Sequence, residues 1–312
     1  MQQAFFSELS QAKSVLIAGA GGGFDVISGL PLYFYLRRQG VAVTLANLSF
    51  TELAFAESRQ VFPQLYQISA HDAALPYFPE KYLLEFLQQR GEDPAVYAFA
   101  YDVGVQPLRA AYAWLAQTHQ IDTIVLVDGG TDSLMFGDEA KVGTLVEDAC
   151  SIIAAAKIPC ARRLLLAIGF GVEHEFNHHA CLQNIASLCE SGDFLGSFSL
   201  TPQMPEGQAF LQLTAFLNQR MPLHTSIVTN SIAGAMRGAF GDIHVTARSR
   251  DSEQFLSPLM SLYWSFKLDG LAARIQFGAE IEHSQTMSEV AQAFKLSRIR
   301  NPRRAHQSIP LK

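Results

Sequence analysis

Four acidic side chains within residues 128–139 are the clearest sign of chemistry in the sequence. They are Asp128, Asp132, Asp138 and Glu139. Carboxylates this close together repel one another unless a cation, a proton or a hydroxyl-rich ligand compensates their charge. Asp128 and Asp132 are therefore candidates both for catalysis and for binding a metal ion. The alternative is structural, with these two residues capping a helix and bracing the loop while Asp138 and Glu139 are solvated.

A glycine-rich turn near the N-terminus, Gly19 to Asp25, is a second candidate binding element. It follows an apolar run with strand character and precedes an amphipathic segment that predicts a helix. Glycines let the backbone approach a ligand closely, and N–H groups at a helix start favour an anion. We therefore predict that this turn binds a phosphate group, with Gly21, Gly22, Gly23 and Asp25 as the cofactor-binding residues. The alternative is a turn that only tightens a strand–helix junction.

The turn departs from the fingerprint of dinucleotide-binding proteins. Phe24 occupies the position of the third glycine, and Asn47 follows the second predicted strand, where an acidic residue would bind a ribose hydroxyl. A standard NAD site is therefore disfavoured. Asn47 remains a candidate cofactor-binding residue, as do Gly129 and Gly130 in the second glycine-rich turn.

The stretch 173–178 carries a third set of candidates. His174-Glu175-Phe176-Asn177-His178 matches H-E-x-x-H, in which two histidines bind zinc and the glutamate activates water. A metalloprotease needs this motif inside a long helix, whereas here it begins directly after a predicted buried strand. A zinc hydrolase using His174, Glu175 and His178 is thus the weaker alternative. His174 is a candidate metal ligand, Glu175 a candidate catalytic residue and Glu173 a candidate cofactor-binding residue.

Alternating strand and helix patterns must position these side chains. The predicted strands are 14–18, 41–46, 95–100, 123–127 and 164–168, and the predicted helices are 26–38, 81–90, 106–118 and 144–157. This alternation favours an α/β, Rossmann-like fold with a mostly parallel sheet and helices on both faces. Ligands of such sheets bind beyond the carboxyl ends of the strands. Since every candidate residue follows a predicted strand, we expect one shared site at that edge.

The whole chain, 1–312, is predicted to be one such domain. A long insertion at about 49–80, rich in aromatic residues and interrupted by prolines, is typical of a lid or binding loop, and a helical or tail extension starts at about 250. The last third predicts a loop-rich crossing at 192–208, strands at 225–229 and 242–246, and an apolar helix at 257–268. This last helix is expected in the core or at a subunit contact, which would make the protein a homo-oligomer.

Composition excludes several classes of partner. The net charge of −6 gives no general attraction for polyanions, so no nucleic-acid partner is expected. No apolar run reaches the ~18 residues that a membrane span needs, and the N-terminus has no signal-peptide pattern. The four cysteines form no C-x-x-C pair and are typical of buried thiols in a reducing compartment. These features indicate a cytoplasmic protein with a small-molecule ligand.

Four segments together resemble a known family. They are G-x-G-G-G-x-D-V at Gly19–Val26, V-D-G-G-x-D-S-L-x-x-G-x-E at Val127–Glu139, G-T/S-x-x-E-D at Gly143–Asp148 and G-x-G-V-[DE]-x-E at Gly169–Glu175. The chain resembles the family called domain of unknown function 1152 (DUF1152) over nearly its whole length. The resemblance implies a Rossmann-like fold and supplies no established reaction. It includes Glu175 in the family pattern and leaves His174 and His178 outside it.

These observations predict an enzyme that acts on a small phosphate- or carboxylate-bearing metabolite at the carboxyl-terminal edge of a parallel sheet. Asp128, Asp132 and Glu175 would supply metal ligation or acid–base chemistry, as in a metal-dependent hydrolase, lyase or transferase. The alternative is a non-catalytic nucleotide- or metabolite-binding protein whose carboxylates bind ribose hydroxyls. The expected cofactor is accordingly a divalent metal ion or a nucleotide.

Overall fold

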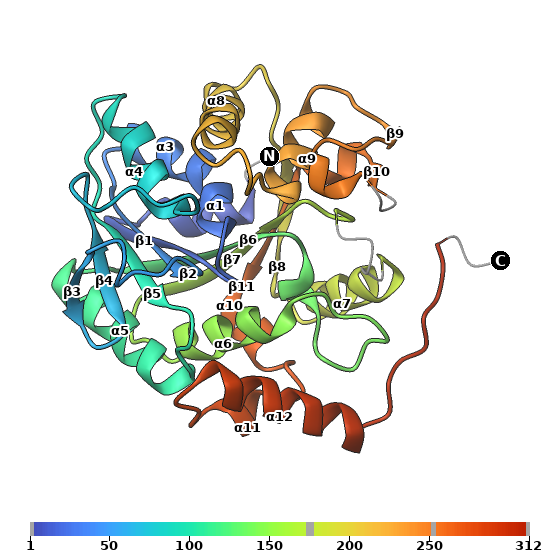
Figure 1. The fold of residues 1–312 in the computed structure, drawn as a ribbon. Coiled ribbons are helices and arrows are strands. Elements are labelled where there is room, and N and C mark those ends of the chain that lie inside the picture. Colours follow the sequence, from blue (N-terminus) through green and yellow to red (C-terminus); the bar gives the residue numbers. More distant parts are fainter. Residues whose placement is uncertain (1–2, 173–177, 251–253, 310–312) are drawn as a thin grey trace.

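A nine-stranded sheet forms the centre of the molecule in the computed structural model, which describes residues 3–172, 178–250 and 254–309 (Figure 1). Its strands lie in the order β3-β4-β5-β2-β1-β6-β7-β11-β8. They are β1 (Ser14–Gly19), β2 (Ala42–Ser49), β3 (Arg59–Phe62), β4 (Leu65–Ile68), β5 (Val96–Ala100), β6 (Thr123–Gly129), β7 (Arg162–Ile168), β8 (Phe194–Ser199) and β11 (Leu262–Lys267). A separate small ladder pairs β9 (Gly241–Asp242) with β10 (Phe255–Leu256).

The five central strands, β5-β2-β1-β6-β7, are all parallel, and both edges of the sheet are antiparallel. β1 lies in the middle, where its side chains alternate between two cores. Leu16 and Ala18 pack into one core, and Val15 and Ile17 into the other. Because both faces of β1 are covered, the strand is apolar throughout rather than alternating.

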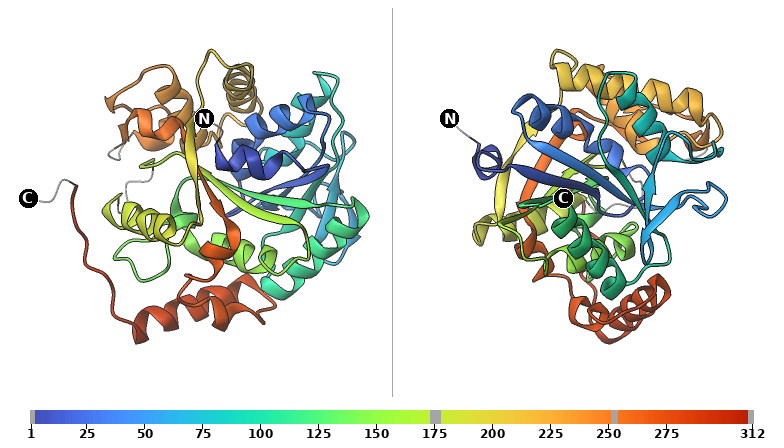
Figure 2. Two further views of the ribbon diagram at one scale, coloured as in Figure 1. Left: turned by 180° about the vertical axis from the view of Figure 1, so that it is seen from behind. Right: turned by 90° about the vertical axis from the view of Figure 1, so that its left-hand side faces the viewer.

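Helices cover both faces of the sheet (Figures 1 and 2). One face carries α5 (Val105–Thr118), α6 (Leu145–Ala155), α7 (His178–Glu190), α10 (Leu268–Ala272), α11 (Gly278–Ile281) and α12 (Met287–Arg300). The other carries α1 (Ala4–Leu9), α2 (Asp25–Ser28), α3 (Leu30–Arg38), α4 (Pro79–Gln88), α8 (Pro205–Arg220) and α9 (Ile227–Met236). The predicted α/β fold, with a mostly parallel sheet between two helical layers, is confirmed.

Three segments of the last third differ from their predictions, and of the strand predicted at 242–246 only Asp242 lies in a strand, β9. Residues 225–229, predicted as a strand from their β-branched side chains, instead begin α9. The Oγ atom of Ser226 accepts a hydrogen bond from the N–H of Thr229 and caps this helix. Residues 257–268, predicted as a helix, contain β11, whose aromatic residues suit a strand. β11 lies between β7 and β8, inside the sheet, so this segment belongs to the core.

Three connections also differ in detail from the sequence patterns. The predicted helix 26–38 is broken at Gly29 into α2 and α3, since Pro31 has no N–H to continue the hydrogen bonds of α2. The insertion 49–80 forms the β3–β4 hairpin, which extends the sheet beyond β5. The crossing 192–208 contains β8.

The C-terminal segment packs against the rest of the molecule through arginines. After α12 the chain runs along the outside toward α7 (Figures 1 and 2). There Arg304 donates hydrogen bonds to Asp138, to the fully buried Glu139 and to Asn184 of α7. Arg298 donates to the backbone carbonyls of Gly137, Glu139 and Ala140. The basic tail therefore binds the loop that follows Asp132. Within the described part of the chain, none of the helices has the length and apolar character needed to cross a bilayer.

Candidate functional site

A pocket of about 340 Å³ opens beyond the carboxyl ends of β1 and β6. The chain passes from β1 to β2 on one side and reaches β6 on the other, so the strand order reverses between β1 and β6. This is where open parallel sheets bind ligands. The described residues that line it are Gly21, Gly22, Gly23, Phe24, Asp25, Phe50, Tyr77, Asp128, Gly129, Asp132, Thr144, Glu147, Asp148, Ser226, Ile227, Val228 and Thr229.

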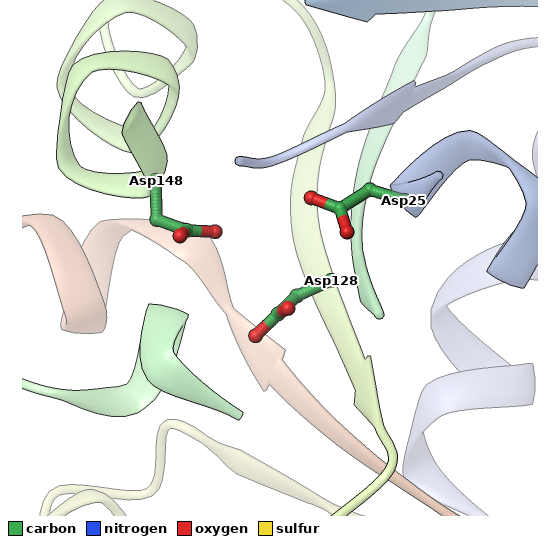
Figure 3. Close-up of side chains that lie close together, drawn as sticks. All are labelled: Asp25, Asp128 and Asp148. Atoms are coloured by element: carbon green, nitrogen blue, oxygen red, sulfur yellow. The ribbon is translucent and has the colours of Figure 1, made fainter. Parts of the chain in front are cut away.

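Three aspartates converge in this pocket from distant parts of the sequence. Asp25 begins α2, Asp128 lies at the end of β6 and Asp148 lies in the first turn of α6. One carboxylate oxygen from each lies within 4.8 Å of the other two. Figure 3 shows the three carboxylates pointing toward a common space. We call these residues the aspartate triad.

Hydrogen bonds fix two members of the triad in place. Asp25 accepts from the N–H of Gly21 at Oδ2 (2.6 Å) and from the N–H of Gly129 at Oδ1 (3.1 Å). Asp128 accepts at Oδ2 from the hydroxyl (2.5 Å) and the N–H (3.2 Å) of Ser133. A carboxylate has about four acceptor sites on its two oxygens, so these hydrogen bonds still leave each side chain able to bind a metal ion.

Asp148 is held differently. Its side chain is buried, and its Oδ1 atom has no hydrogen-bond partner among the described residues. Burial and then the charge of Asp132 hold the pKa of Asp148 well above its usual range. The same two causes raise the pKa of Asp25 to about 7. A buried carboxylate without a partner costs several kcal/mol when ionised, so this arrangement favours a bound proton or cation.

The glycine turn shapes the triad instead of offering its N–H groups to an anion. The N–H of Gly21 is used by Asp25, and the N–H of Gly23 donates to the carbonyl of Leu48. A β-carbon at position 21 would lie 2.8 Å from Oδ2 of Asp148, and Gly22 has a φ of +94°, which disfavours side chains. The helix that follows, α2, has only four residues. Glycine is therefore needed at position 21 because carboxylates pack against its backbone, and at position 22 because of its positive φ and the nearby carbonyl of Leu48.

The start of α9 is the better anion-binding element of the pocket. Ser226, Ile227, Val228 and Thr229 line the wall, and α9 continues for ten residues. Ser226 caps the N–H of Thr229, whereas the N–H groups of Ile227 and Val228 have no partner within the helix, and the helix dipole adds positive potential there. An anion in the pocket would thus face the start of α9 across from the triad.

A comparison with known protein families identifies the family of this chain. The family described as "Protein of unknown function (DUF1152)" matches residues 16–301. The chain belongs to the DUF1152 family. No curated protein and no solved structure matches it. The DUF1152 match contains the whole aspartate triad and the start of α9.

Within this DUF1152 chain, the predicted site residues fall into two groups. Gly21, Gly22, Gly23, Asp25, Asp128, Gly129 and Asp132 line the pocket, whereas Asn47 and Gly130 are not among its described lining residues. Asn47 is buried behind the glycine turn, where its amide donates to the carbonyl of Gly23 and to Glu80. It therefore supports the turn and does not face the pocket as a ribose ligand would. Gly130 forms a bridge with Ile168 of β7.

The described side chains that could hold a metal ion together, Asp25, Asp128 and Asp148, share only Asp128 with the predicted set of Asp128, Asp132 and His174, and His174 lies outside the described residues. Asp132 points its Oδ2 at the N–H (2.8 Å) and hydroxyl (2.5 Å) of Thr144, so it braces the start of α6. The carboxylates that lie close to that of Asp128 in the group that could hold a metal ion are those of Asp25 and Asp148.

The zinc motif falls largely outside the described residues, which exclude Glu173, His174 and Glu175. His178 begins α7, and its ring packs against that of Phe170 with centroids 5.2 Å apart. It is not among the described residues of the pocket wall. Nor does it belong to a group of three metal-ligating side chains in the part of the chain that the structure describes.

Three features of the site have no counterpart among the predicted site residues. Glu147 and Asp148 look like ordinary acidic residues in the first turn of a helix, where the helix dipole favours them. Their occurrence in the G-T/S-x-x-E-D segment of the DUF1152 family was the available signal. The start of α9 was not predicted, because residues 225–229 are rich in β-branched side chains, which indicate a strand. The triad itself depends on α6 returning beside β6, which no local pattern encodes.

Proposed function

We propose that this protein is an enzyme that uses a divalent cation, held by the aspartate triad, to act on a small phosphate-bearing metabolite. The observation that carries the proposal is the convergence of the Asp25, Asp128 and Asp148 carboxylates, within which Asp148 is buried and its Oδ1 has no hydrogen-bond partner among the described residues. Three carboxylates form a hard oxygen donor set, which suits Mg²⁺ or Mn²⁺ rather than a thiol-preferring metal.

The charge of the pocket supports a cation-dependent anion site. Its described lining residues include five carboxylates and no lysine or arginine. An anionic metabolite would be repelled by this wall unless a cation neutralised it. A phosphate group could bind the cation with one oxygen and the N–H groups at the start of α9 with another. A single carboxylate group offers fewer oxygens for bridging, so phosphate is the preferred group.

Glu147 is the candidate acid–base residue. It lines the pocket beside the triad without belonging to it. Burial and then Asp132 raise the pKa of Glu147, which brings it closer to the neutral range in which a carboxyl group can both give and accept protons. In a hydrolase, lyase or transferase, the cation would stabilise charge on the phosphate while Glu147 transfers a proton.

The first test is direct metal binding. Isothermal titration of the purified protein with Mn²⁺ should show one site, and Asp148→Asn should weaken it on the order of 100-fold, as expected for loss of a charged ligand. Asp102→Asn is the matched control, because Asp102 follows β5 at the same edge but is exposed and outside the pocket wall. Absent Mn²⁺ binding, or equal binding by both variants, would refute the proposal.

We further propose that the protein works in the cytoplasm on a small-molecule ligand. All four cysteines are free thiols, which fits a reducing compartment. Two of them, Cys150 and Cys181, are buried.

A further inference from the structure

We infer that the metabolite is a nucleotide, whose base stacks on an aromatic ledge formed by Phe24, Phe50 and Tyr77. All three side chains line the pocket that contains the triad. The inference rests on the proposed function, since it takes the phosphate group to bind at the cation and the start of α9. It adds the chemical class of the rest of the ligand.

Phe50 is the key residue of the ledge. It directly follows β2, and 49% of its surface is exposed although it lies in the wall of a pocket. Exposing an aromatic ring of this size costs about 25 cal/mol for each Å² of apolar surface left in water. A planar ligand that covers the ring recovers this free energy, and base–aromatic stacking contributes ~1–3 kcal/mol per base.

The ledge is held in place before any ligand arrives. A β-carbon at Gly23 would lie 3.2 Å from Phe50 and 3.3 Å from the Tyr77 hydroxyl, so both rings pack on the backbone of this glycine. The rings of Phe24 and Tyr77 meet edge to face with centroids 5.8 Å apart. The hydroxyl of Thr51 donates a hydrogen bond to the carbonyl of Tyr77, which links the segment that follows β2 to the ledge.

The glycine turn sets the spacing between the two ends of the pocket. Gly21 contacts the triad and Gly23 contacts the ledge. Their Cα atoms are at most about 7.6 Å apart, because successive Cα atoms are separated by 3.8 Å. The triad and the ledge are therefore neighbours within one pocket, as the phosphate and the base are within one nucleotide. The pocket volume of about 340 Å³ is at the lower end of small-molecule sites and suits one nucleotide rather than a dinucleotide.

Ribose 5-phosphate and AMP form a matched pair of probes, because they differ only in the base. In the presence of Mg²⁺, we expect AMP to bind about tenfold or more tightly than ribose 5-phosphate, since one stacked base is worth ~1–3 kcal/mol. Phe50→Ala should remove this difference and leave the affinity for ribose 5-phosphate unchanged. Phe55→Ala is the control, because Phe55 lies in the same connection, is 75% exposed and does not line the pocket.

The outcomes separate the inference from the proposed function. Equal affinities for the two probes, or a Phe50→Ala variant that retains the preference for AMP, would overturn the nucleotide while the phosphate site stands. If ribose 5-phosphate, AMP and inorganic phosphate all fail to bind with Mg²⁺ present, the proposed function itself is overturned. A preference for AMP that Phe50→Ala abolishes and Phe55→Ala preserves would support both.

Discussion

The N–H of Gly129 donates a hydrogen bond to Oδ1 of Asp25 over 3.1 Å and so joins the two glycine-rich turns. Asp25 is also bound by the N–H of Gly21, in its own turn. One carboxylate thus bridges the ends of β1 and β6, which are neighbours in the sheet. The two motifs, separate in the sequence, lie side by side and both line a single pocket.

The first prediction concerns the close packing of Gly21. Gly21→Ala would place a β-carbon 2.8 Å from Oδ2 of Asp148 and 3.1 Å from Oδ2 of Asp25, so both carboxylates must move. We expect Mn²⁺ affinity, measured by titration calorimetry, to fall tenfold or more, about 1.4 kcal/mol, while the circular dichroism spectrum is retained. Gly40→Ala is the control: Gly40 has a φ of +75° and open space around it, so this change should cost about 1 kcal/mol of stability without affecting Mn²⁺.

The second prediction concerns the pH dependence of stability without metal. Burial and Asp132 raise the pKa of Asp25 to about 7, and burial raises the pKa of Glu80 to about 7. A pKa raised in the folded state means that the folded protein binds the proton more tightly than the unfolded chain does. This contribution is complete below the unfolded pKa near 4 and is lost as the pH rises through 7. The melting temperature of the chelator-treated protein should therefore fall between pH 5 and pH 8.

Mn²⁺ should reduce this fall, because the cation replaces the proton that the triad loses. A melting temperature that rises with pH in the chelated protein would contradict the assignment of buried, repelling carboxylates.

Asp148→Asn provides the third prediction. At pH 8 the metal-free variant should be more stable than the natural protein, because a buried carboxyl group, which is costly there whether it stays ionised beside other carboxylates or binds a proton, is replaced by a neutral amide. We expect a gain on the order of 1–2 kcal/mol in urea unfolding, together with loss of stabilisation by Mn²⁺. Asp132→Ala should instead destabilise the protein, because it removes the oxygen that accepts two hydrogen bonds from Thr144. A destabilised Asp148→Asn protein would show that Asp148 is a structural brace.

The fourth prediction concerns the C-terminal tail. Arg304→Ala leaves the fully buried Glu139 without its cationic partner, although the N–H groups of Phe136 and Gly137 still donate to it. The free energy of unfolding should fall by about 1–3 kcal/mol. Arg303→Ala changes the neighbouring, exposed arginine and should have little effect. Equal unfolding midpoints for the two variants would mean that the tail does not stabilise this loop.

The fifth prediction separates the triad from the zinc motif. Elemental analysis of the purified protein should show no stoichiometric zinc that depends on His174 and His178. A double change of these histidines to alanine should leave Mn²⁺ binding intact, because the triad does not include them. Zinc that is present in the natural protein and disappears in the double variant would restore the metal hydrolase alternative.

Much of the frame of the site could be predicted from sequence, because strand ends carry local signals. The apolar runs before Gly19 and Asp128 identify neighbouring parallel strands, and their polar continuations must meet at one edge. The direction of single side chains could not be predicted in this way. Asn47 follows the same logic as Asp128 yet turns away behind the glycine turn, where Glu80 accepts its hydrogen bond.

Residues that join the site through tertiary packing were the hardest to predict. Asp148 enters the pocket because α6 packs beside β6, and Thr229 does so because residues 225–229 cap a helix instead of extending the sheet. Each needs a contact between segments far apart in sequence. Periodicity within a short window carries no information about such contacts.

The position of β11 has a consequence for synthesis of the chain. β11 pairs with β7 on one side and β8 on the other, although both are made before it. Until Leu262–Lys267 has left the ribosome, β7 is an unpaired edge of the parallel sheet and β8 cannot join it. An apolar edge of this kind can pair with other chains. Newly made chains that stop before residue 262 should therefore aggregate, and the final third of the sequence completes the sheet rather than adding to a finished domain.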